Sequence, residues 1–145
     1  MRHITHHKRG ACAMLLRRDG RVLLHLRCRR AHVYPGCGAF FGGGVERGES
    51  PFQALCREWR EELGYGLLPE HRLFDVAWHF KKRGRAVMRV LDHTFIVHWE
   101  PWQRLQLREG QGKAWFTVEA ALALPSLPPH ERHVLTRLLR KRSML

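Results

Sequence analysis

The stretch GGVERGESPFQALCREWREELGY, residues 43–65, sets the framework for the rest of the chain. It begins as a glycine-rich loop and continues into a helix. Ser50 is a favourable N-cap that opens an S-x-x-Q capping box, and Pro51 suits the first helical position. Gly64 is a natural stop signal. We therefore predict a helix over residues 51–63.

Three glutamates share one side of this predicted helix. At 100° per residue, Glu58, Glu61 and Glu62 fall within about a third of the helix circumference. Like charges three and four residues apart repel, at a cost of about a few tenths of a kcal/mol per pair. The cluster does not stabilise the helix, so something must neutralise it. The candidates are Arg57 and Arg60 on the neighbouring flank, or a divalent cation.

Clustered carboxylates with room for waters and phosphate oxygens are what Mg²⁺ prefers. The glycines Gly42, Gly43 and Gly44 allow the backbone to approach a ligand closely, so that loop amides or carbonyls can contact phosphate or metal. Glu49, beside the predicted N-cap, can fold back toward Arg57. Together these features indicate phosphoryl chemistry.

The remaining pattern predicts strands and helices on both sides of this helix. Asp19 and Gly20 separate two apolar runs, which is a strong hairpin signal. Residues 31–48 are rich in glycine and are expected to form a loop. The fold class is α/β (α+β), with a mixed β-sheet and helices packed on it. Further strands are predicted at 11–16, 21–27, 73–80, 86–99 and 114–118, and further helices at 118–124 and 128–142.

Length and composition predict a single globular domain over residues 1–145, with residues 1–9 flexible. The chain has 145 residues, of which 44% are hydrophobic and 27% charged, as in ordinary globular proteins. The apolar run 11–16 is too short for a signal peptide or a membrane span. The four cysteines form no C-x-x-C pair, which favours reduced thiols. We therefore expect a cytoplasmic protein with no membrane partner.

The net charge is unusual. Lys and Arg number 26 against 13 Asp and Glu, for a formal charge of +13. Such a surface attracts polyanions, including nucleotides, RNA, DNA and acidic membranes. The alternative is a solvated basic face with no dedicated partner. Charge alone identifies no ligand.

The same residues 43–65 resemble the Nudix box, G-x5-E-x7-R-E-U-x-E-E-x-G-U, in which U is a bulky apolar residue. Its seven fixed residue types would coincide by chance on the order of once in 10⁸ start sites. The order of the other predicted elements also resembles Nudix hydrolases of the MutT-like, nucleotide-pool-cleaning type. Every specified position is met, by Gly43, Glu49, Arg57, Glu58, Trp59, Glu61, Glu62, Gly64 and Tyr65.

The resemblance implies a Nudix fold, a mixed sheet sandwiched between helices, and hydrolysis of a nucleoside diphosphate linked to another group X. It implies that Glu58 and Glu62 are the main Mg²⁺ ligands, with Mn²⁺ as an alternative ion, and that Glu61 is a further ligand or a general base. It also implies that the Gly42 carbonyl contacts the metal.

Two further catalytic assignments follow from the resemblance. It implies that Arg57 and Glu49 orient the glutamates. Glu109, in a Glu-Gly-Gln turn, resembles a loop glutamate that some members bring to the metal or to the attacking water. A solvated turn residue is the alternative for Glu109.

Candidate substrate contacts lie outside the box. Glu131 follows a Pro-Pro pair where the nucleotide-pool branch places a base-reading residue, although an acid is also favoured at a helix start. Arg27 can hold outer phosphates at the end of a predicted strand. One departure from the family pattern is Phe41, where a proline is usual; it affects loop geometry and substrate approach. Among the aromatic residues Phe40, Phe41, Trp78 and Phe80, some can stack on a base, and at least two are expected in the core.

The expected activity is Mg²⁺-dependent hydrolysis of a small nucleotide, with preference for a possibly oxidised nucleoside triphosphate or a nucleotide sugar. One alternative is a pyrophosphohydrolase acting on the 5′ end of capped or triphosphorylated RNA, which the +13 charge favours. Another is a non-catalytic sensor that binds nucleotide or RNA. Intact Glu58, Glu61 and Glu62 argue against the sensor, because a pure binder gains nothing from water-activating carboxylates. The sequence leaves the oligomeric state open.

Overall fold

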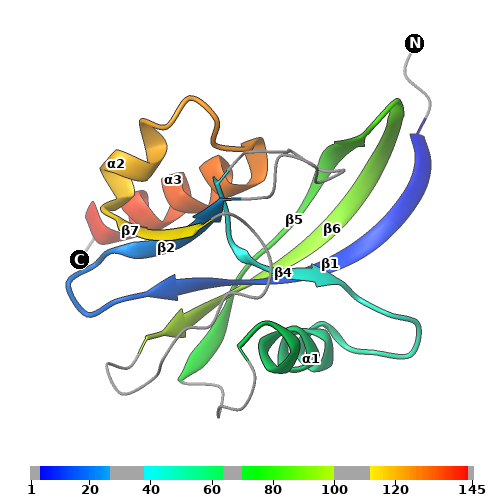
Figure 1. The fold of residues 1–145 in the computed structure, drawn as a ribbon, viewed down its shortest axis with the longest axis horizontal. Coiled ribbons are helices and arrows are strands. Elements are labelled where there is room, and N and C mark those ends of the chain that lie inside the picture. The colour runs from blue at the N-terminus through cyan, green and yellow to red at the C-terminus, as the bar shows by residue number, and fades with distance from the viewer. Residues whose placement is uncertain (1–3, 27–37, 64–69, 100–111, 144–145) are drawn as a thin grey trace.

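A computed structural model describes residues 4–26, 38–63, 70–99 and 112–143, which form a sheet with helices on both faces (Figure 1). The helix predicted over residues 51–63 is confirmed, and the other predicted elements are found with shifted ends. The elements in chain order are β1 (Ile4–Leu16), β2 (Val22–Leu26), β3 (Gly38–Ala39), β4 (Phe41–Gly44), α1 (Pro51–Leu63), β5 (His71–Arg83), β6 (Ala86–His98), β7 (Gly112–Phe116), α2 (Val118–Leu122) and α3 (Pro129–Ser143).

The sheet is mixed, as predicted. Its path runs β3-β2-β1-β6-β5, with β4 paired to β1 and β7 paired to β2. The β1–β6 pair is parallel, whereas the other pairs are antiparallel. The two central strands therefore join the N-terminal segment to one more than 80 residues later, with Gly10 opposite Asp92.

The predicted hairpin between β1 and β2 is present. Gly20 has a φ of +89°, which a glycine adopts without strain. The Asp19 carboxylate accepts hydrogen bonds from Arg17 Nε at 2.9 Å and Arg21 Nη1 at 2.7 Å, and these close the turn. The two strands pair only at Leu16 and Val22. Beyond that point β2 turns away from β1 and pairs with β7.

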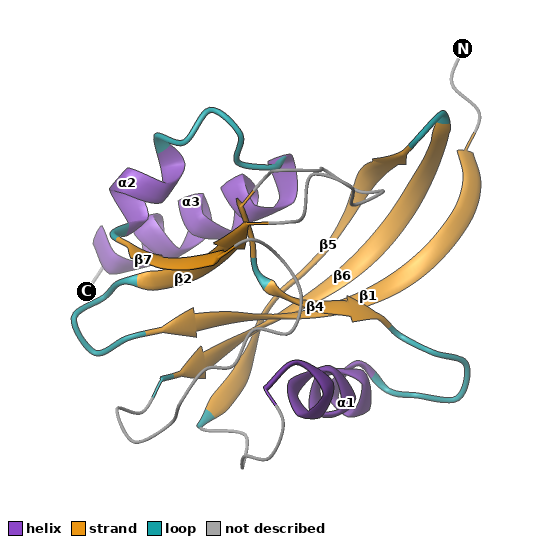
Figure 2. Cartoon of the chain, in the orientation of Figure 1, coloured by secondary structure: helices purple, strands orange, loops and turns teal. Residues whose placement is uncertain are grey.

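Alternation along the strands divides the core into two layers. Figure 2 shows the helices beside them, with α1 on one side of the sheet and α2 and α3 on the other. One layer lies between the sheet and α1, and the other lies under α2 and α3. Neighbouring residues point to opposite layers, so that Phe41 joins the α1 layer and Phe40 the other; both are buried. The α1 layer also contains Ala11, Ala13, Leu15, Leu23, Ala54, Leu55, Trp59, Phe95 and Val97.

The helix ends follow from local sequence. The Ser50 hydroxyl accepts from Gln53 N at 3.1 Å, and Gln53 Oε1 accepts from Ser50 N at 2.8 Å, so the predicted capping box is confirmed. The C-terminal helix buries Val134, Leu135 and Leu138 against the sheet. Within the described residues, no helix combines the length and apolar character needed to cross a membrane.

Two expectations about irregular segments are wrong. Residues 38–39 and 41–44, expected in a loop, form β3 and β4, because glycines without side chains let β4 lie directly against β1. Residues 4–9, expected to be flexible with the rest of the N-terminus, continue β1 and pair in parallel with β6. Long-range pairing overrides the weak local signal in both segments.

Gly42 is required by the close approach of β4 to β1. It has a φ of +152°, and an added Cβ would lie 2.6 Å from Cys12 Cα. We predict that Gly42→Ala lowers the free energy of unfolding by about 2–4 kcal/mol through strain and overpacking. Urea unfolding checks this, with Gly44→Ala as the control, because a Cβ at Gly44 meets nothing within 4 Å. Equal losses in the two variants would contradict the assignment.

Candidate active site

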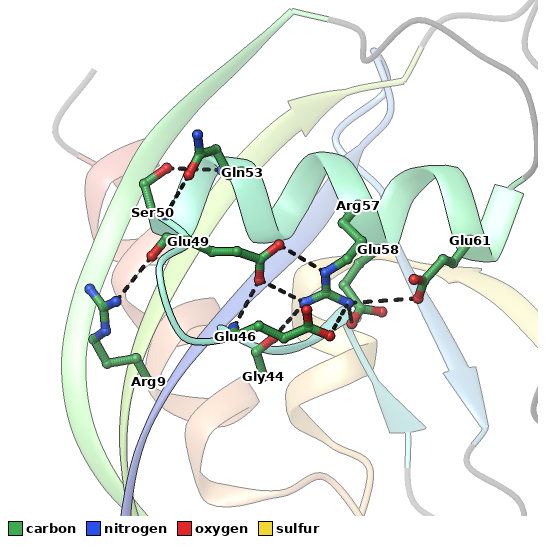
Figure 3. A network of polar contacts seen from close by, with 9 residues as sticks. All are labelled: Arg9, Gly44, Glu46, Glu49, Ser50, Gln53, Arg57, Glu58 and Glu61. Atoms are coloured by element: carbon green, nitrogen blue, oxygen red, sulfur yellow. Dashed lines mark hydrogen bonds and ion pairs between the residues drawn. The ribbon is translucent and has the colours of Figure 1, made fainter.

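The Arg57 guanidinium joins α1 to the loop that precedes it (Figure 3). Its Nε donates to Glu49 Oε2 at 2.9 Å and its Nη2 to Glu49 Oε1 at 3.0 Å, a bidentate pair. The Nη2 group also donates to the Gly44 carbonyl at 2.9 Å, and Nη1 donates to Glu58 Oε1 at 3.0 Å. Glu49 therefore folds back toward Arg57 as the sequence suggested.

Further contacts fix the loop. Glu49 Oε1 accepts from Glu46 N at 2.8 Å, and the Glu49 carbonyl accepts from Arg9 Nη2 at 3.1 Å. The hydrogen bonds from Arg57 and then from the Glu46 amide hold the pKa of Glu49 below its usual range. The hydrogen bonds that Arg57 donates to the Glu49 and Glu58 carboxylates raise the pKa of Arg57. Both partners therefore stay charged at neutral pH.

Two glutamates of α1, Glu58 and Glu61, lie beside Arg57. Glu58 is largely buried and lies against Gly43, where any Cβ would come closer than 3.0 Å to its carboxylate. Glu61 is exposed, with Oε2 3.7 Å from Arg57 Nη1. Glu62 belongs to the same helix, but its side chain is outside the described part. The Gly43 backbone thus leaves a cradle that the Glu58 carboxylate occupies.

Two hollows meet beside this cradle, and both contact Lys8, Arg9 and Gly44. The first has a volume of about 220 Å³ and lies on the α3 side of the sheet, where Phe40, Asp92, His130 and Glu131 line it. The second has a volume of about 590 Å³ and contains Arg57, Glu58 and Trp78. An extended ligand can therefore pass the glycines of β4 and reach both sides of the sheet.

A buried polar cluster forms one wall of the smaller hollow. The Asp92 carboxylate contacts His79 Nε2, and it lies 3.5 Å from Lys81 Nζ and 3.8 Å from His130 Nε2. Burial by itself would raise the pKa of Asp92, but the hydrogen bond from His79 and the charge of Lys81 bring it below its usual range. Asp92 is therefore an ionised hydrogen-bond acceptor at the hollow.

His130 is neutral in this cluster. Burial lowers its pKa to about 4, against the opposing charge of Asp92. Its Nε2 lies 3.1 Å from Thr94 Oγ1, and its buried Nδ1 has no hydrogen-bond partner among the described residues. Burial also raises the pKa of the neighbouring Cys12 thiol, which keeps that thiol protonated. A ligand in the smaller hollow therefore meets the ionised Asp92 and the neutral imidazole of His130, with the cations Lys8, Arg9 and Lys81 also in the lining.

His79, Asp92 and His130 are close enough together to suggest a metal site, since their ligand atoms lie within 4.8 Å of one another. The ring geometry argues against it. The two imidazoles stack with centroids 4.3 Å apart and planes inclined by 14°. A metal ion binds in the plane of each imidazole, and two nearly parallel stacked planes share no such point near both rings. The cluster is arranged for hydrogen bonding, whereas the hard carboxylate oxygens of α1 suit a divalent cation.

Other predicted residues have mixed outcomes. Glu131 is buried and lines the smaller hollow beside His130, so it is positioned to meet a ligand. Arg27 and Glu109 lie outside the described residues. Phe40 and Phe41 are in the core, as expected of two of the four aromatic residues, whereas Trp78 and Phe80 are exposed.

Sequence analysis missed the cluster around Asp92. The available signal was a lone acid inside the apolar β6 run, together with His79 and Lys81 at alternate positions of β5, which place both side chains on one face of that strand. Recognising that β6 would lie between β1 and β5, with α3 beside this cluster, required the tertiary structure.

A family profile described as NUDIX domain matches residues 6–138, nearly the whole chain. The chain belongs to the Nudix family. Among curated proteins, CTP pyrophosphohydrolase of Escherichia coli (strain K12) is 36% identical over 117 residues, which are 80% of this chain and 81% of that protein. Nucleoside triphosphatase NudI of Shigella flexneri is 50% identical over 54 residues, 37% of this chain and 38% of that protein.

Solved structures agree on the fold of this Nudix hydrolase. The MutT protein from Methanosarcina mazei Go1 has a TM-score of 0.74 at 22% identity, with 94% of this chain and 95% of that chain covered. A MutT NUDIX hydrolase from Burkholderia pseudomallei has a TM-score of 0.73 at 28% identity, with 91% and 98% covered. The protein is therefore an enzyme, a Nudix pyrophosphohydrolase that acts on phosphoric anhydrides of nucleotides.

The buried state of His130 makes stability depend on pH. The unfolded chain takes up a proton near pH 6.5 that the folded protein does not take up until about pH 4. We predict that the free energy of unfolding falls as the pH is lowered from 6.5 to 4, by up to about 1.4 kcal/mol per pH unit. Asp92 adds a further loss only below its ordinary pKa of 3.8.

Urea unfolding at several pH values between 4 and 7.5 measures this slope. In His130→Gln the slope between pH 6.5 and 4 should become shallower. An unchanged slope in His130→Gln would show that another group is responsible.

Proposed function

We propose that this Nudix enzyme hydrolyses a nucleoside triphosphate, or a nucleotide sugar, in a Mg²⁺-dependent reaction that releases a nucleoside monophosphate. Mn²⁺ is the alternative ion. The observation that carries the proposal is the junction at Gly42–Gly44. There the smaller hollow, which has room for one small ring system, meets the larger hollow that contains Glu58 of α1. The free thiols of Cys12 and Cys56 fit the proposed cytoplasmic location.

The residues at the cradle fit a hard divalent ion. Glu58, Glu61, Glu62 and the Gly42 carbonyl would hold it, because all four offer oxygen ligands. When bound, such an ion lowers the pKa of water and neutralises charge on the phosphate chain. The Gly43 cradle fits this arrangement, since it keeps the Glu58 carboxylate beside the loop backbone.

The chain's own residues then perform the remaining tasks. Arg57 and Glu49 fix the direction of the Glu58 carboxylate. Lys8 and Arg9, which line both hollows, bind the phosphate oxygens. Glu61 accepts the proton of the attacking water, because it is exposed at the same helix face. We retain Glu109 as a further carboxylate and Arg27 as a further phosphate contact in this proposal.

The smaller hollow supports a nucleotide whose base carries an exocyclic amino group. Asp92 is ionised and Glu131 lines the same hollow, so both can accept hydrogen bonds from an exocyclic amino group of a base. The curated relative that matches most of this chain is named CTP pyrophosphohydrolase, and cytosine carries such an amino group. Phe40 supplies an apolar wall for the ring.

A turnover screen tests the proposal. Purified protein with Mg²⁺ is assayed against nucleoside triphosphates, oxidised triphosphates, nucleotide sugars, dinucleoside polyphosphates and capped RNA. We expect a triphosphate to be the best substrate, and Glu62→Gln to lower kcat by about 10³-fold or more while the far-ultraviolet circular dichroism spectrum stays unchanged. The control is Glu119→Gln, an exposed acid of α2.

Two outcomes would contradict the proposal. Near-normal turnover by Glu62→Gln would refute the metal assignment. Nucleotide binding without turnover across the whole panel would favour the non-catalytic sensor.

Hydrolysis at the 5′ end of RNA is a second candidate, favoured by the net charge of +13. Neutralising several phosphates releases counterions, so the KM for RNA should rise steeply with salt. We predict that between 50 and 200 mM salt the KM for triphosphorylated RNA rises by more than about tenfold, while the KM for the small nucleotide changes much less. Parallel salt dependence of the two substrates, or no turnover of RNA, would exclude this candidate.

A further inference from the structure

The large apolar side chains that are exposed within the described residues gather on one side of the sheet. Four of them, Leu73, Val76, Trp78 and Phe80, belong to the edge strand β5, and the fifth, Phe52, begins the adjoining α1. Phe80 is 56% exposed and Trp78 is 48% exposed. Isolated exposed apolar residues need no explanation, but a row of them along one strand does.

Strand register places these side chains on a common face with cations. Residues directly opposite each other on paired strands point to the same side. Arg89 lies between His7 and Phe80, and Leu91 lies between Arg9 and Trp78. We call the face formed by these two rows, His7–Arg89–Phe80 and Arg9–Leu91–Trp78, the open face.

The helices leave the open face uncovered. In Figure 1 the β5–β6 hairpin and the start of β1 extend away from α2 and α3, while α1 lies near the opposite end of these strands. The core layer under α1 ends at Ala11 and Phe95, and neither row of the open face belongs to it. The sheet therefore presents side chains of three strands to solvent.

The open face is basic and carries no acid from its own strands. Both acids described on β5 and β6 point elsewhere: Asp75 is buried and bonds Arg137 of α3 at 2.5 Å, and Asp92 faces the smaller hollow. The Arg89 guanidinium lies 4.1 Å from the centroid of the Trp78 ring. Aromatic rings interleaved with cations suit a ligand that has both flat rings and negative charge.

A single-stranded polynucleotide has this chemistry. Its bases stack on aromatic rings, and its phosphates attract arginines, without a need for a particular sequence. A duplex keeps its bases stacked inside, out of reach of Trp78 and Phe80. A second copy of this chain would bring two basic faces together in a molecule of net charge +13. Because cellular DNA is almost wholly duplex, the abundant single strand is RNA.

We propose that the open face of β1, β6 and β5 binds single-stranded RNA, with bases stacked on Phe80 and Trp78 and phosphates held by Arg89, Arg9 and His7. This surface is distinct from the smaller hollow on the α3 side of the sheet. It borders the active site, because His7, Arg9 and Trp78 also line the hollow that contains Glu58. Binding here does not require that the RNA be hydrolysed.

Fluorescence anisotropy with a labelled oligouridine of about 15 nucleotides and a 5′-hydroxyl end tests the proposal. EDTA is included, so that hydrolysis cannot contribute and failure of the proposed activity cannot affect the result. We expect Phe80→Ala and Arg89→Ala each to raise the Kd by about tenfold. Arg89→Ala should also lower the slope of log K against log salt by about 0.7.

Matched controls separate the open face from general basic charge. Phe52→Ala removes another exposed ring, and Arg140→Ala removes an exposed arginine of α3; both should leave the Kd within about twofold. Neither Phe80 nor Arg89 lines either of the two hollows that meet at Gly44, so their variants should keep wild-type kcat/KM on the nucleotide.

Several results would overturn the proposal. These are an equal loss in Arg140→Ala and Arg89→Ala, an unchanged Kd in Phe80→Ala, or equally tight binding of duplex RNA. Tighter binding of the matching single-stranded DNA would overturn the choice of RNA. A dimer in light scattering that Phe80→Ala dissociates would show that the face is covered by a second copy instead.

Discussion

The structure around α1 depends on one guanidinium. Arg57 has donors in a fixed planar fork, and it uses them on the Glu49 carboxylate, the Gly44 carbonyl and the Glu58 carboxylate. Lysine offers one point charge and could not make these contacts together. The glutamates of α1 repel one another, so a cation held in place by backbone and side chains is what allows them to share one helix face. The repulsion among these glutamates is thus a feature of the site and does not stabilise the helix.

Glycines set the spacing between that helix and the sheet. At Gly42 and Gly43 a Cβ would collide with β1 or with Glu58, and at Gly10 it would collide with Asp92. Each glycine therefore gives space to a different neighbour: the backbone of β1 at Gly42, the Glu58 carboxylate at Gly43, and the Asp92 carboxylate at Gly10. Because β4 pairs closely with β1, the smaller hollow on one side of the sheet meets the larger hollow, which contains Glu58, on the other side.

Local signals accounted for the parts of the molecule that local interactions build. The capping box at Ser50, the Asp19-Gly20 turn and the return of Glu49 to Arg57 each span eight residues or fewer, and all three were predictable. The strand β4 and the polar wall around Asp92 were not, because β4 depends on its antiparallel pairing with β1, and the wall depends on β6, the parallel neighbour of β1, and on α3. Parallel neighbours far apart in sequence leave no local pattern that identifies them. The Nudix box identified the α1 half of the site, whereas the residues of the smaller hollow had no comparable motif.

The same difference in sequence separation bears on the order in which the site is assembled during synthesis. Glu49 and Arg57 are both available once α1 leaves the ribosome, but the polar wall needs β6 and the start of α3, the latter some 70 residues later along the chain. At about 5–20 residues per second that gap lasts several seconds. Until β6 has been synthesised, β1 lacks its central neighbour, and until α3 follows, the layer that α3 covers is exposed to solvent. The nascent chain therefore passes through a stage at which Glu49 and Arg57 are both present while the sheet beside α1 is still incomplete.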